Sequence, residues 1–363
     1  MNILKTAPAV FAVGETYQIM VPVNKECLMW VKVGDKCYYD QSNGVLRSLV
    51  PVHRVTVPAS ELEREKKYTL CIRKIIDRKP YFPEIEEVVE MEFNFCPVGN
   101  DNIKAYHISD AHGFVDRAVS AAKHFESKYG KIDFLILNGD VIDHSGEIEN
   151  FDAIYEIAGQ ITGGNVPVVF SRGNHDLRGT YAESMFEYIP AENGNTYYTF
   201  RLGGVWGVIL DCGEDKPDTN AEYGGTICCH DFRMSETEYL KKVIESEEYN
   251  ADGINYRTVI SHVPFTSKRQ SPFDIEKDIY RDWGTLLREN VKPDVMICGH
   301  THKQRICMPG DEWDEMGHPC PVIECAEVNF EEEYYGGCGF VFSDSGVSVM
   351  FNDSEKSTEQ RIK

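Results

Sequence analysis

The sequence predicts an α/β protein in which a small all-β domain precedes a larger region of alternating strands and helices. Two patterns indicate this division. Up to about residue 96 the apolar residues follow a period of two or form continuous runs, and no helical period of useful length appears. From residue 101 onward, short apolar runs alternate with amphipathic segments, and polar motifs rich in Asp and His stand where several of these runs end.

The amino-terminal region, residues 1–96, is predicted to be a small β-sandwich. Turn residues such as Gly34-Asp35 separate its apolar runs. Leu62 and Tyr68, on either side of a charged turn, make the region similar to immunoglobulin-like or fibronectin type III domains. Residues 96–101 contain Pro and Gly and are predicted to form a linker. The expected strands cover residues 16–23, 27–33, 53–57, 68–75 and 88–95.

The second region, residues 101–351, is predicted to be a layered α/β domain. The capping box Ser235-Glu236-Thr237-Glu238 indicates the start of one of its helices. Gly203-Gly204 is expected to turn a hairpin between residues 197–202 and 205–210. The polar tail, residues 352–363, is expected to be loose. Helices are expected at 116–129, 151–161, 236–246 and 278–290, and late strands at 321–325, 339–342 and 347–351.

Five polar motifs follow predicted strands of this second region. Because functional groups of α/β sheets gather beyond the carboxyl ends of strands, we expect the motifs to converge in space. Their carboxylate, imidazole and amide groups suit borderline cations, and a pair of such cations neutralises a phosphoryl group and activates water. In chain order the motifs are Asp110-Ala111-His112, Gly139-Asp140-Val141-Ile142-Asp143, Gly173-Asn174-His175-Asp176, His262 and Gly299-His300-Thr301-His302.

The ordered set D-x-H, G-D-x-x-D, G-N-H-D, H and G-H-x-H resembles the calcineurin-like metallophosphoesterase superfamily across residues 101–351. The resemblance implies a four-layer α/β/β/α sandwich. It also implies a metal-dependent phosphatase or phosphodiesterase that uses two divalent or trivalent ions, namely Mn, Fe, Zn or a mixture. The ligands that it implies are Asp110, His112 and His302 for the first ion, Asn174, His262 and His300 for the second, and Asp140 as the bridge between them.

The same resemblance implies catalytic roles for two further residues. A hydroxide held between the ions would attack phosphorus in line, while His175 would protonate the leaving alkoxide or orient the phosphate. Asp143 would hydrogen-bond His175, fix its tautomer and raise its basicity. Arg172 and Arg178 flank the G-N-H-D motif, and a guanidinium binds phosphate through paired hydrogen bonds, so both are candidate substrate-binding residues, with Arg178 preferred.

A β-sandwich before a metal domain also resembles the purple acid phosphatases. Those enzymes carry a tyrosinate iron ligand three residues after the bridging aspartate, whereas this chain has Asp143 at that position. The departure removes the ligand responsible for their colour. We therefore expect a colourless protein, closer in this respect to the phosphoprotein phosphatases and related phosphodiesterases.

Composition narrows the possible partners and the location. The formal net charge of -22 disfavours nucleic acid and anionic membranes as partners. The partner that the resemblance implies is a small-molecule phosphate ester. No apolar run approaches the ~20 residues of a membrane span. The start of the chain does not resemble a signal peptide, and the twelve cysteines include no C-x-x-C, so a cytoplasmic protein with reduced thiols is expected. The sequence does not predict the oligomeric state.

Two other classes of function stay open at this point. One is a non-catalytic scaffold or interaction protein on the same fold, although such proteins usually lose ligands that this chain retains. The other is a Mn-dependent nuclease, against which the acidic composition weighs. Residues 211–233, rich in Gly and Asp and without clear periodicity, are expected to form a lid or specificity loop in any of these cases.

Overall fold

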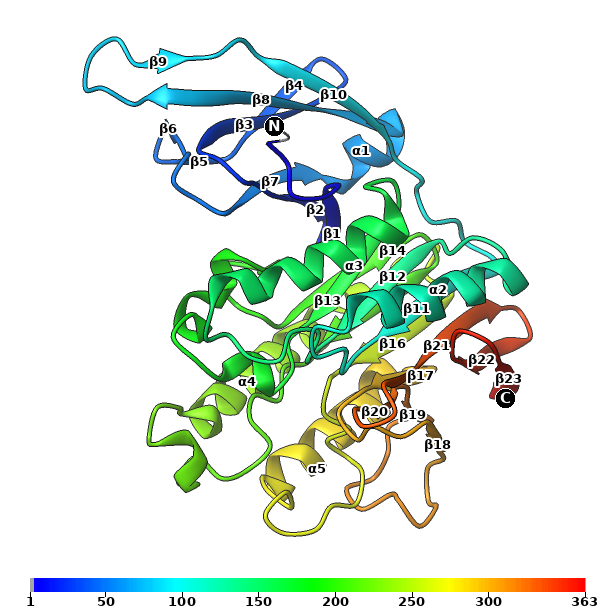
Figure 1. Ribbon diagram of the computed structural model, residues 1–363. Helices are drawn as coiled ribbons and strands as arrows, with labels where there is room; N and C mark the ends of the chain where they lie inside the picture. The colour runs from blue at the N-terminus through cyan, green and yellow to red at the C-terminus, as the bar shows by residue number, and fades with distance from the viewer. Residues whose placement is uncertain (1–2, 363) are drawn as a thin grey trace.

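The computed structural model describes residues 3–362 and contains two β-sheets packed face to face, with helices outside them (Figure 1). The larger sheet has ten strands: β1 (Ala9–Val13), β2 (Thr16–Pro22), β7 (Val52–Pro58), β11 (Ile103–Ile108), β12 (Phe134–Asn138), β13 (Pro167–Ser171), β20 (Glu327–Asn329), β21 (Tyr334–Ser343), β22 (Gly346–Asn352) and β23 (Ser357–Ile362). Its order is β23-β22-β21-β11-β12-β13-β1-β2-β7, with β20 paired to β21. Strands β11, β12 and β13 are parallel neighbours.

The second sheet has six strands: β14 (Tyr198–Leu202), β15 (Val205–Ile209), β16 (Tyr256–Ile260), β17 (Val295–Cys298), β18 (Arg305–Cys307) and β19 (Val322–Glu324). Their order is β14-β15-β16-β17-β19-β18. Strands β14 and β15 form the predicted hairpin, and β15, β16, β17 and β19 run parallel. The carboxyl ends of β16 and β17 therefore lie side by side, as do those of β11, β12 and β13 in the first sheet.

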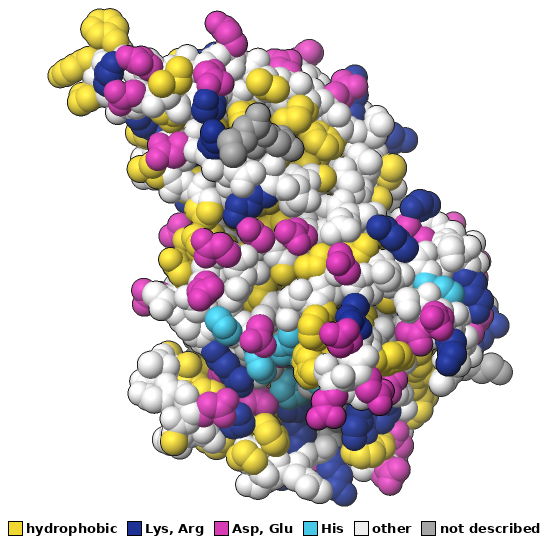
Figure 2. All heavy atoms as spheres, in the orientation of Figure 1, with side chains coloured by type: hydrophobic (Ala, Val, Ile, Leu, Met, Phe, Trp, Pro, Cys, Tyr) yellow, Lys and Arg dark blue, Asp and Glu magenta, His cyan; other side chains and the backbone are white. Residues whose placement is uncertain are grey.

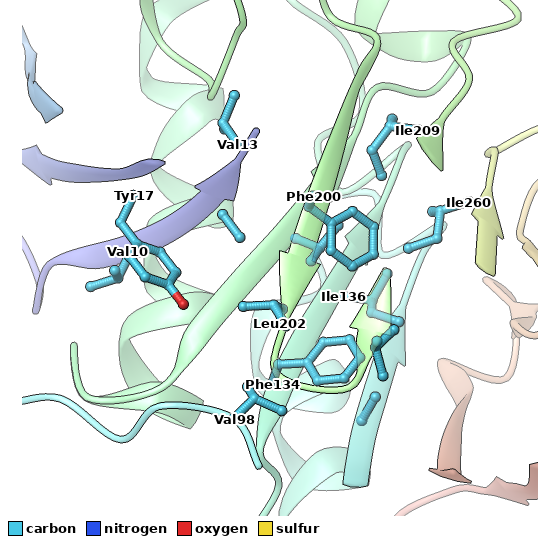
Figure 3. Close-up of a cluster of buried hydrophobic side chains, with 14 of the residues drawn as sticks. Val10, Val13, Tyr17, Val98, Phe134, Ile136, Phe200, Leu202, Ile209 and Ile260 are labelled. Carbon is cyan, nitrogen blue, oxygen red and sulfur yellow. The ribbon is translucent and has the colours of Figure 1, made fainter. Parts of the chain in front are cut away.

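The core between the sheets follows from the two-residue period of the strands. On β12, Phe134 and Ile136 belong to the cluster between the sheets, where they are buried together with Ile209 of the second sheet (Figure 3). The alternate residues Leu135 and Leu137 belong to the cluster on the outer face. Burial on both faces explains the continuous apolar runs of these strands, and each such side chain contributes about 1.5–3 kcal/mol.

Helices cover the outer face of each sheet and complete the predicted four-layer α/β/β/α sandwich. Helices α2 (Val115–Tyr129) and α3 (Asp152–Thr162) pack on the first sheet through Phe125 and Tyr155. Helices α4 (Cys229–Ser246) and α5 (Lys277–Leu286) pack on the second through Leu240 and Trp283. Gly130 ends α2, as expected, and a π-helical turn at Leu287–Val291 prolongs α5 to the predicted end.

The amino-terminal region contains all five predicted strands, three of which lie in a separate sheet. That sheet comprises β3 (Cys27–Val33), β4 (Lys36–Tyr39), β8 (Lys67–Asp77), β9 (Glu84–Ile85) and β10 (Val89–Asn94), and β5 (Gln41–Ser42) pairs with β6 (Val45–Leu46) beside it. Strand β1 pairs with β13, so the two regions share the ten-stranded sheet. The division into residues 1–96 and 101–351 and the immunoglobulin or fibronectin likeness stay predictions.

Two elements differ from the sequence prediction at their ends. Helix α4 begins at Cys229 rather than near 236, and Ser235 lies inside it, where its hydroxyl donates to the Asp231 carbonyl at 3.1 Å. The prediction that a capping box at Ser235 starts this helix is therefore wrong. The polar tail is not loose, because β23 pairs with β22 along its length. Main-chain pairing stabilises this edge strand, and among its side chains only Ile362 is buried in the core.

A short helix, α1 (Ala59–Glu65), lies where none was predicted, and only Leu62 on it is buried. Among residues 3–362 no helix is both long and apolar enough to cross a membrane. The twelve cysteines, all within these residues, are free thiols.

Candidate metal centre

The five motifs meet where the carboxyl ends of strands from both sheets face each other. Asp110, Asp140 and Asn174 follow β11, β12 and β13 of the first sheet, whereas His262 and His300 follow β16 and β17 of the second. Figure 2 shows histidine side chains gathered in a hollow of the surface. The predicted convergence at the strand ends is present.

The main chain in these motifs adopts unusual conformations. Five non-glycine residues of the centre have positive φ, namely Asp110 (54°), His112 (43°), Asp140 (50°), His300 (72°) and His302 (53°). Each such residue costs of order 1–3 kcal/mol, and clusters of them mark functional sites. The surrounding packing must therefore offset several kcal/mol of local strain.

Glycines in the motifs allow the close approach of these loops. A Cβ atom on Gly173 would lie 2.2 Å from Oδ1 of Asp140, and one on Gly139 would lie 2.5 Å from Nδ1 of His262. A Cβ atom on Gly299 would lie 2.7 Å from Oδ2 of Asp110. Each of these three glycines is thus required by a close contact with another motif.

The first group of donors consists of Asp110, His112 and His302, whose ligand atoms lie within 4.8 Å of one another. Nε2 of His302 is 3.3 Å from Oδ1 of Asp110. Nε2 of His112 is buried and has no hydrogen-bond partner among the described residues. A buried nitrogen without a partner is costly, and a metal ion at this point would satisfy it.

The second group consists of Asp140, His262 and His300, with Asn174 beside them. Nε2 of His262 is 3.1 Å from Oδ2 of Asp140 and 3.8 Å from Oδ1 of Asp110. Nδ1 of His300 is 2.9 Å from the side-chain amide of Asn174. Nε2 of His262 therefore lies close to a carboxylate of each group, Asp140 of its own and Asp110 of the first.

Hydrogen bonds to one ring nitrogen orient the imidazoles of His262 and His300. Nδ1 of His262 is 2.7 Å from the Asn138 carbonyl, to which it donates, so Nε2 is left as the ligand atom. On His300 the outward nitrogen is Nε2, which is 3.3 Å from Asp215 and 3.0 Å from Arg269. These contacts leave the opposite ring nitrogens directed at the centre.

The charges at the centre favour a cation. Burial raises the pKa of Asp110, but His262 and His302 lower it further, so the net shift is downward. Burial lowers the pKa of His262, yet Asp140 and Asp110 raise it to about 10 overall. Two buried carboxylates thus hold a positive charge between them, which a metal ion can replace.

His175 lies next to the donors without being one of them. Its main-chain N–H donates to Oδ1 of Asp140 at 2.9 Å, its Nδ1 is 3.0 Å from the main-chain carbonyl of Asp143, and its Nε2 is 3.3 Å from Arg178. The expected contact with Asp143 therefore exists, but the carbonyl makes it and not the carboxylate. The carboxylate is exposed and lies 3.2 Å from Nδ1 of His112.

The two candidate arginines occupy different places. Arg178 lines the cleft at the centre and is held by two hydrogen bonds to Glu214, at 2.7 and 3.0 Å. Arg172 pairs with buried Asp211 at 2.7 Å and does not line that cleft. Geometry favours Arg178 over Arg172, while substrate binding by either stays a prediction.

Sequence reasoning missed three residues beside the ligands. Asp215 and Arg269 contact His300, and buried Glu324 accepts hydrogen bonds from Thr301 and Arg305. Only Asp215 had a signal, because it falls in the segment predicted to form a lid. Arg269 and Glu324 lie in no motif and reach the centre through long-range contacts.

Comparison with known proteins supports the fold and the centre. Residues 103–304 match the sequence model of the calcineurin-like phosphoesterases, and the chain belongs to this family. The curated protein sequences yield no significant match.

Solved structures add a likeness over the whole chain. A purple acid phosphatase, PPD1 from seeds of yellow lupin (Lupinus luteus), is similar with a TM-score of 0.62 and 13% identity, over 99% of this chain and 74% of that one. GAP50, the anchor in the inner membrane complex of Plasmodium, is similar with a TM-score of 0.45 and 14% identity, over 72% of this chain and 90% of that one. The first likeness shows a shared fold, and the second score is too low to carry an inference.

Proposed function

We propose that this chain is a dinuclear metal-dependent phosphoesterase that hydrolyses small phosphate monoesters or diesters. The observation that carries the proposal is the buried, unpartnered Nε2 of His112 within a complete set of donors from five strand ends. The donors are Asp110, His112 and His302 for one ion, Asn174, His262 and His300 for the other, and Asp140 between them. Two bound cations of the Mn, Fe or Zn type would supply charge neutralisation and water activation.

Residues of the chain itself would position the ester and move the proton. The carbonyl of Asp143 accepts a hydrogen bond from Nδ1 of His175, so a proton for the leaving alkoxide would be delivered through Nε2. Arg178 is within 3.3 Å of that nitrogen and can bind a phosphoryl oxygen at the same point. Glu214 fixes the direction of the Arg178 guanidinium.

The test is turnover of p-nitrophenyl phosphate and bis-p-nitrophenyl phosphate by metal-loaded protein. We expect hydrolysis of at least one ester and its loss in His175→Ala, with His124→Ala on α2 as the matched control. Elemental analysis of the same preparations should give two ions per chain. Absence of turnover on these esters and on a nucleotide panel, with both ions bound, would support the non-catalytic scaffold instead. Cleavage of single-stranded DNA with Mn would favour the nuclease.

The residue at position 143 gives a spectroscopic prediction. Because Asp143 stands where a purple acid phosphatase has its tyrosinate ligand, we expect no visible charge-transfer band even with iron bound. An absorption spectrum of the iron-loaded protein checks this. A strong visible band would place a phenolate on the iron and contradict the proposed ligand set.

A further inference from the structure

The cleft next to the metal centre is basic, although the chain as a whole is strongly acidic. It has a volume of about 430 Å³, and its lining combines donors of the centre with Arg305 and with Ser267, Lys268, Arg269 and Phe273. Five cationic side chains but only three carboxylates line it, in a chain of formal charge -22. Figure 2 shows Lys and Arg side chains beside the hollow that holds the histidines. The volume suits a small ligand, and the charge suits an anionic one.

Two of the five cations have no carboxylate partner. Arg178 pairs with Glu214, Lys216 with Glu222 and Arg305 with Glu324. Within residues 3–362, by contrast, neither Lys268 nor Arg269 has a carboxylate oxygen within ion-pair distance. Asp215 and Glu324 attract Arg269 only from beyond ion-pair distance, so both cations can still pair directly with a ligand.

The segment Ser267-Lys268-Arg269 also contains hydrogen-bonding groups that lack partners. Oγ of Ser267 and Nη2 of Arg269 are both buried and have no hydrogen-bond partner among the described residues. Leaving a buried guanidinium N–H without a partner costs more than leaving a neutral group, and an anionic oxygen would offset that cost. The three residues together offer three kinds of donor, a hydroxyl, an ammonium and a guanidinium, and two positive charges.

The main chain holds this segment in place next to the metal centre. Ser267 N–H donates to the Pro264 carbonyl at 2.9 Å, and Lys268 N–H donates to the Trp313 carbonyl at 2.7 Å. Nη1 of Arg269 lies 3.0 Å from Nε2 of His300, whose other nitrogen faces the donors. Only the width of one imidazole ring thus separates the Arg269 guanidinium from the centre.

We propose that Ser267, Lys268 and Arg269 form an anion subsite, and that the substrate carries a second phosphate or carboxylate group besides the phosphoryl group that is cleaved. This inference rests on the proposed phosphoesterase function. The scissile group lies at the metal centre, and the second group accepts hydrogen bonds from Arg269 and Ser267 and faces the Lys268 ammonium. Phe273, which is 38% exposed and lines the same cleft, contacts the carbon framework between them. The substrate class is small organic phosphates with at least two anionic groups.

The test is calorimetric binding to the metal-loaded full chain, with three ligands that are not hydrolysed. Methylphosphonate carries one anionic group, phosphonoacetate adds a carboxylate, and 1,3-propylenebisphosphonate adds a second phosphonate. We expect at least one of the two larger ligands to bind about tenfold or more tightly than methylphosphonate, because a charge-assisted hydrogen bond to Arg269 is added. Which of the two binds more tightly identifies the second group.

Substitutions distinguish binding at the subsite from tighter binding that arises only because the larger ligands chelate the metal ions. Arg269→Gln should lower the preference for the larger ligand about tenfold and Lys268→Gln up to about fivefold, since the latter charge is exposed. Arg269→Lys should recover part of the preference, and Lys242→Gln on α4 should leave it unchanged. Elemental analysis confirms that each variant retains its ions. If Arg269→Gln loses them, Lys268→Gln carries the test.

Equal binding of all three ligands by the wild-type protein would overturn the subsite, as would an unchanged preference in the Lys268→Gln, Arg269→Gln double variant. Failure of the proposed function looks different. In that case the preference for the larger ligand persists and depends on Arg269, while no ester is hydrolysed.

Discussion

The molecule contains two buried Asp–His pairs, one in each region, that have the same residue types but different surroundings. In the amino-terminal region, Nδ1 of His53 is 2.6 Å from Asp40 and its Nε2 is 3.4 Å from the Cys27 thiol. Both ring nitrogens therefore have partners. All three side chains are buried, and burial, helped by Asp40, raises the pKa of Cys27 to about 12, so the thiol is not a nucleophile.

The Asp140–His262 pair of the metal centre differs in what remains unsatisfied around it. Nε2 of neighbouring His112 is buried and has no hydrogen-bond partner within residues 3–362, and Asp140 lines an open cleft. The comparison teaches that residue types alone do not define a site. Unused lone pairs together with access to a cleft mark the functional cluster, while complete pairing marks the structural one.

Among the substitutions that test this difference, Asp140→Asn is expected to have the largest effect, on catalytic activity. Loss of the carboxylate between the two donor groups should lower kcat/KM on aryl phosphates by roughly 10³-fold or more, equivalent to about 4 kcal/mol of transition-state stabilisation. Steady-state kinetics with metal-loaded protein measures it. The matched variant Asp40→Asn should stay within about threefold of wild type. Equal losses in the two variants would erase the distinction.

Substitution of the amino-terminal pair is expected to lower stability rather than activity. His53→Ala leaves the buried Asp40 carboxylate without its hydrogen bond and should cost about 2–4 kcal/mol of unfolding free energy. Urea unfolding followed by circular dichroism checks this, with His124→Ala, which should change stability by about 0.5 kcal/mol or less, as control. An unchanged midpoint in His53→Ala would show that the amino-terminal pair is not a structural element.

Asp215 should act on the metal centre only through His300. Removing the carboxylate 3.3 Å from Nε2 of His300, in Asp215→Asn, should weaken binding of one ion about 10–100-fold and leave the other unchanged. Titration with Mn, followed by calorimetry, resolves the two affinities. Asp231→Asn on α4 is the control. Loss of both ions, or of neither, would contradict this role.

The smallest expected effect concerns a third buried histidine, His107, and the pH dependence of stability. Burial, with a smaller opposing contribution from Asp110, lowers the pKa of His107 on β11 to about 3 from its usual value near 6.5. Between these values the unfolded chain binds more protons. Stability is therefore fully present above about pH 6.5 and falls as pH decreases, by up to about 1.4 kcal/mol per pH unit.

His107→Leu should remove this component of the pH dependence. The measurement is the slope of unfolding free energy against pH between roughly pH 6.5 and 5 for wild type and variant, a window set by the lowered pKa of His107. A lower absolute stability of the variant does not affect the comparison of slopes. Identical slopes would show that His107 is protonated in the folded protein as easily as in the unfolded one.

The convergence of the five motifs could be predicted from sequence because each motif begins within three residues of the end of a strand. Runs such as the one before Asp140 are buried on both faces, and the chain can turn only after them, so motif and strand end coincide. The alternation of these strands with helices such as α2 predicted a layered α/β domain, and the family resemblance implied its four layers. These features depend on residues that are close together in the sequence, so local sequence patterns predict them.

Other features depend on contacts between distant residues. Helix α4 was predicted to start late because its buried face includes Arg233 and Glu236, which bond to the loop at 211–214 and disguise the amphipathic period. Strand β23 is stabilised by main-chain pairing, which polarity does not reveal. The contact of His175 with the carbonyl rather than the carboxylate of Asp143 depends on loop conformation. Arg269 contacts His300 only in the folded chain.

The most direct test of the central claim is a crystal structure of Mn-loaded protein with anomalous scattering measured from the metal. The account predicts two peaks on either side of the Asp140 carboxylate, one within bonding distance of Asp110, His112 and His302 and the other of Asn174, His262 and His300. Anomalous peaks elsewhere, or none in a preparation that hydrolyses phosphate esters, would contradict it.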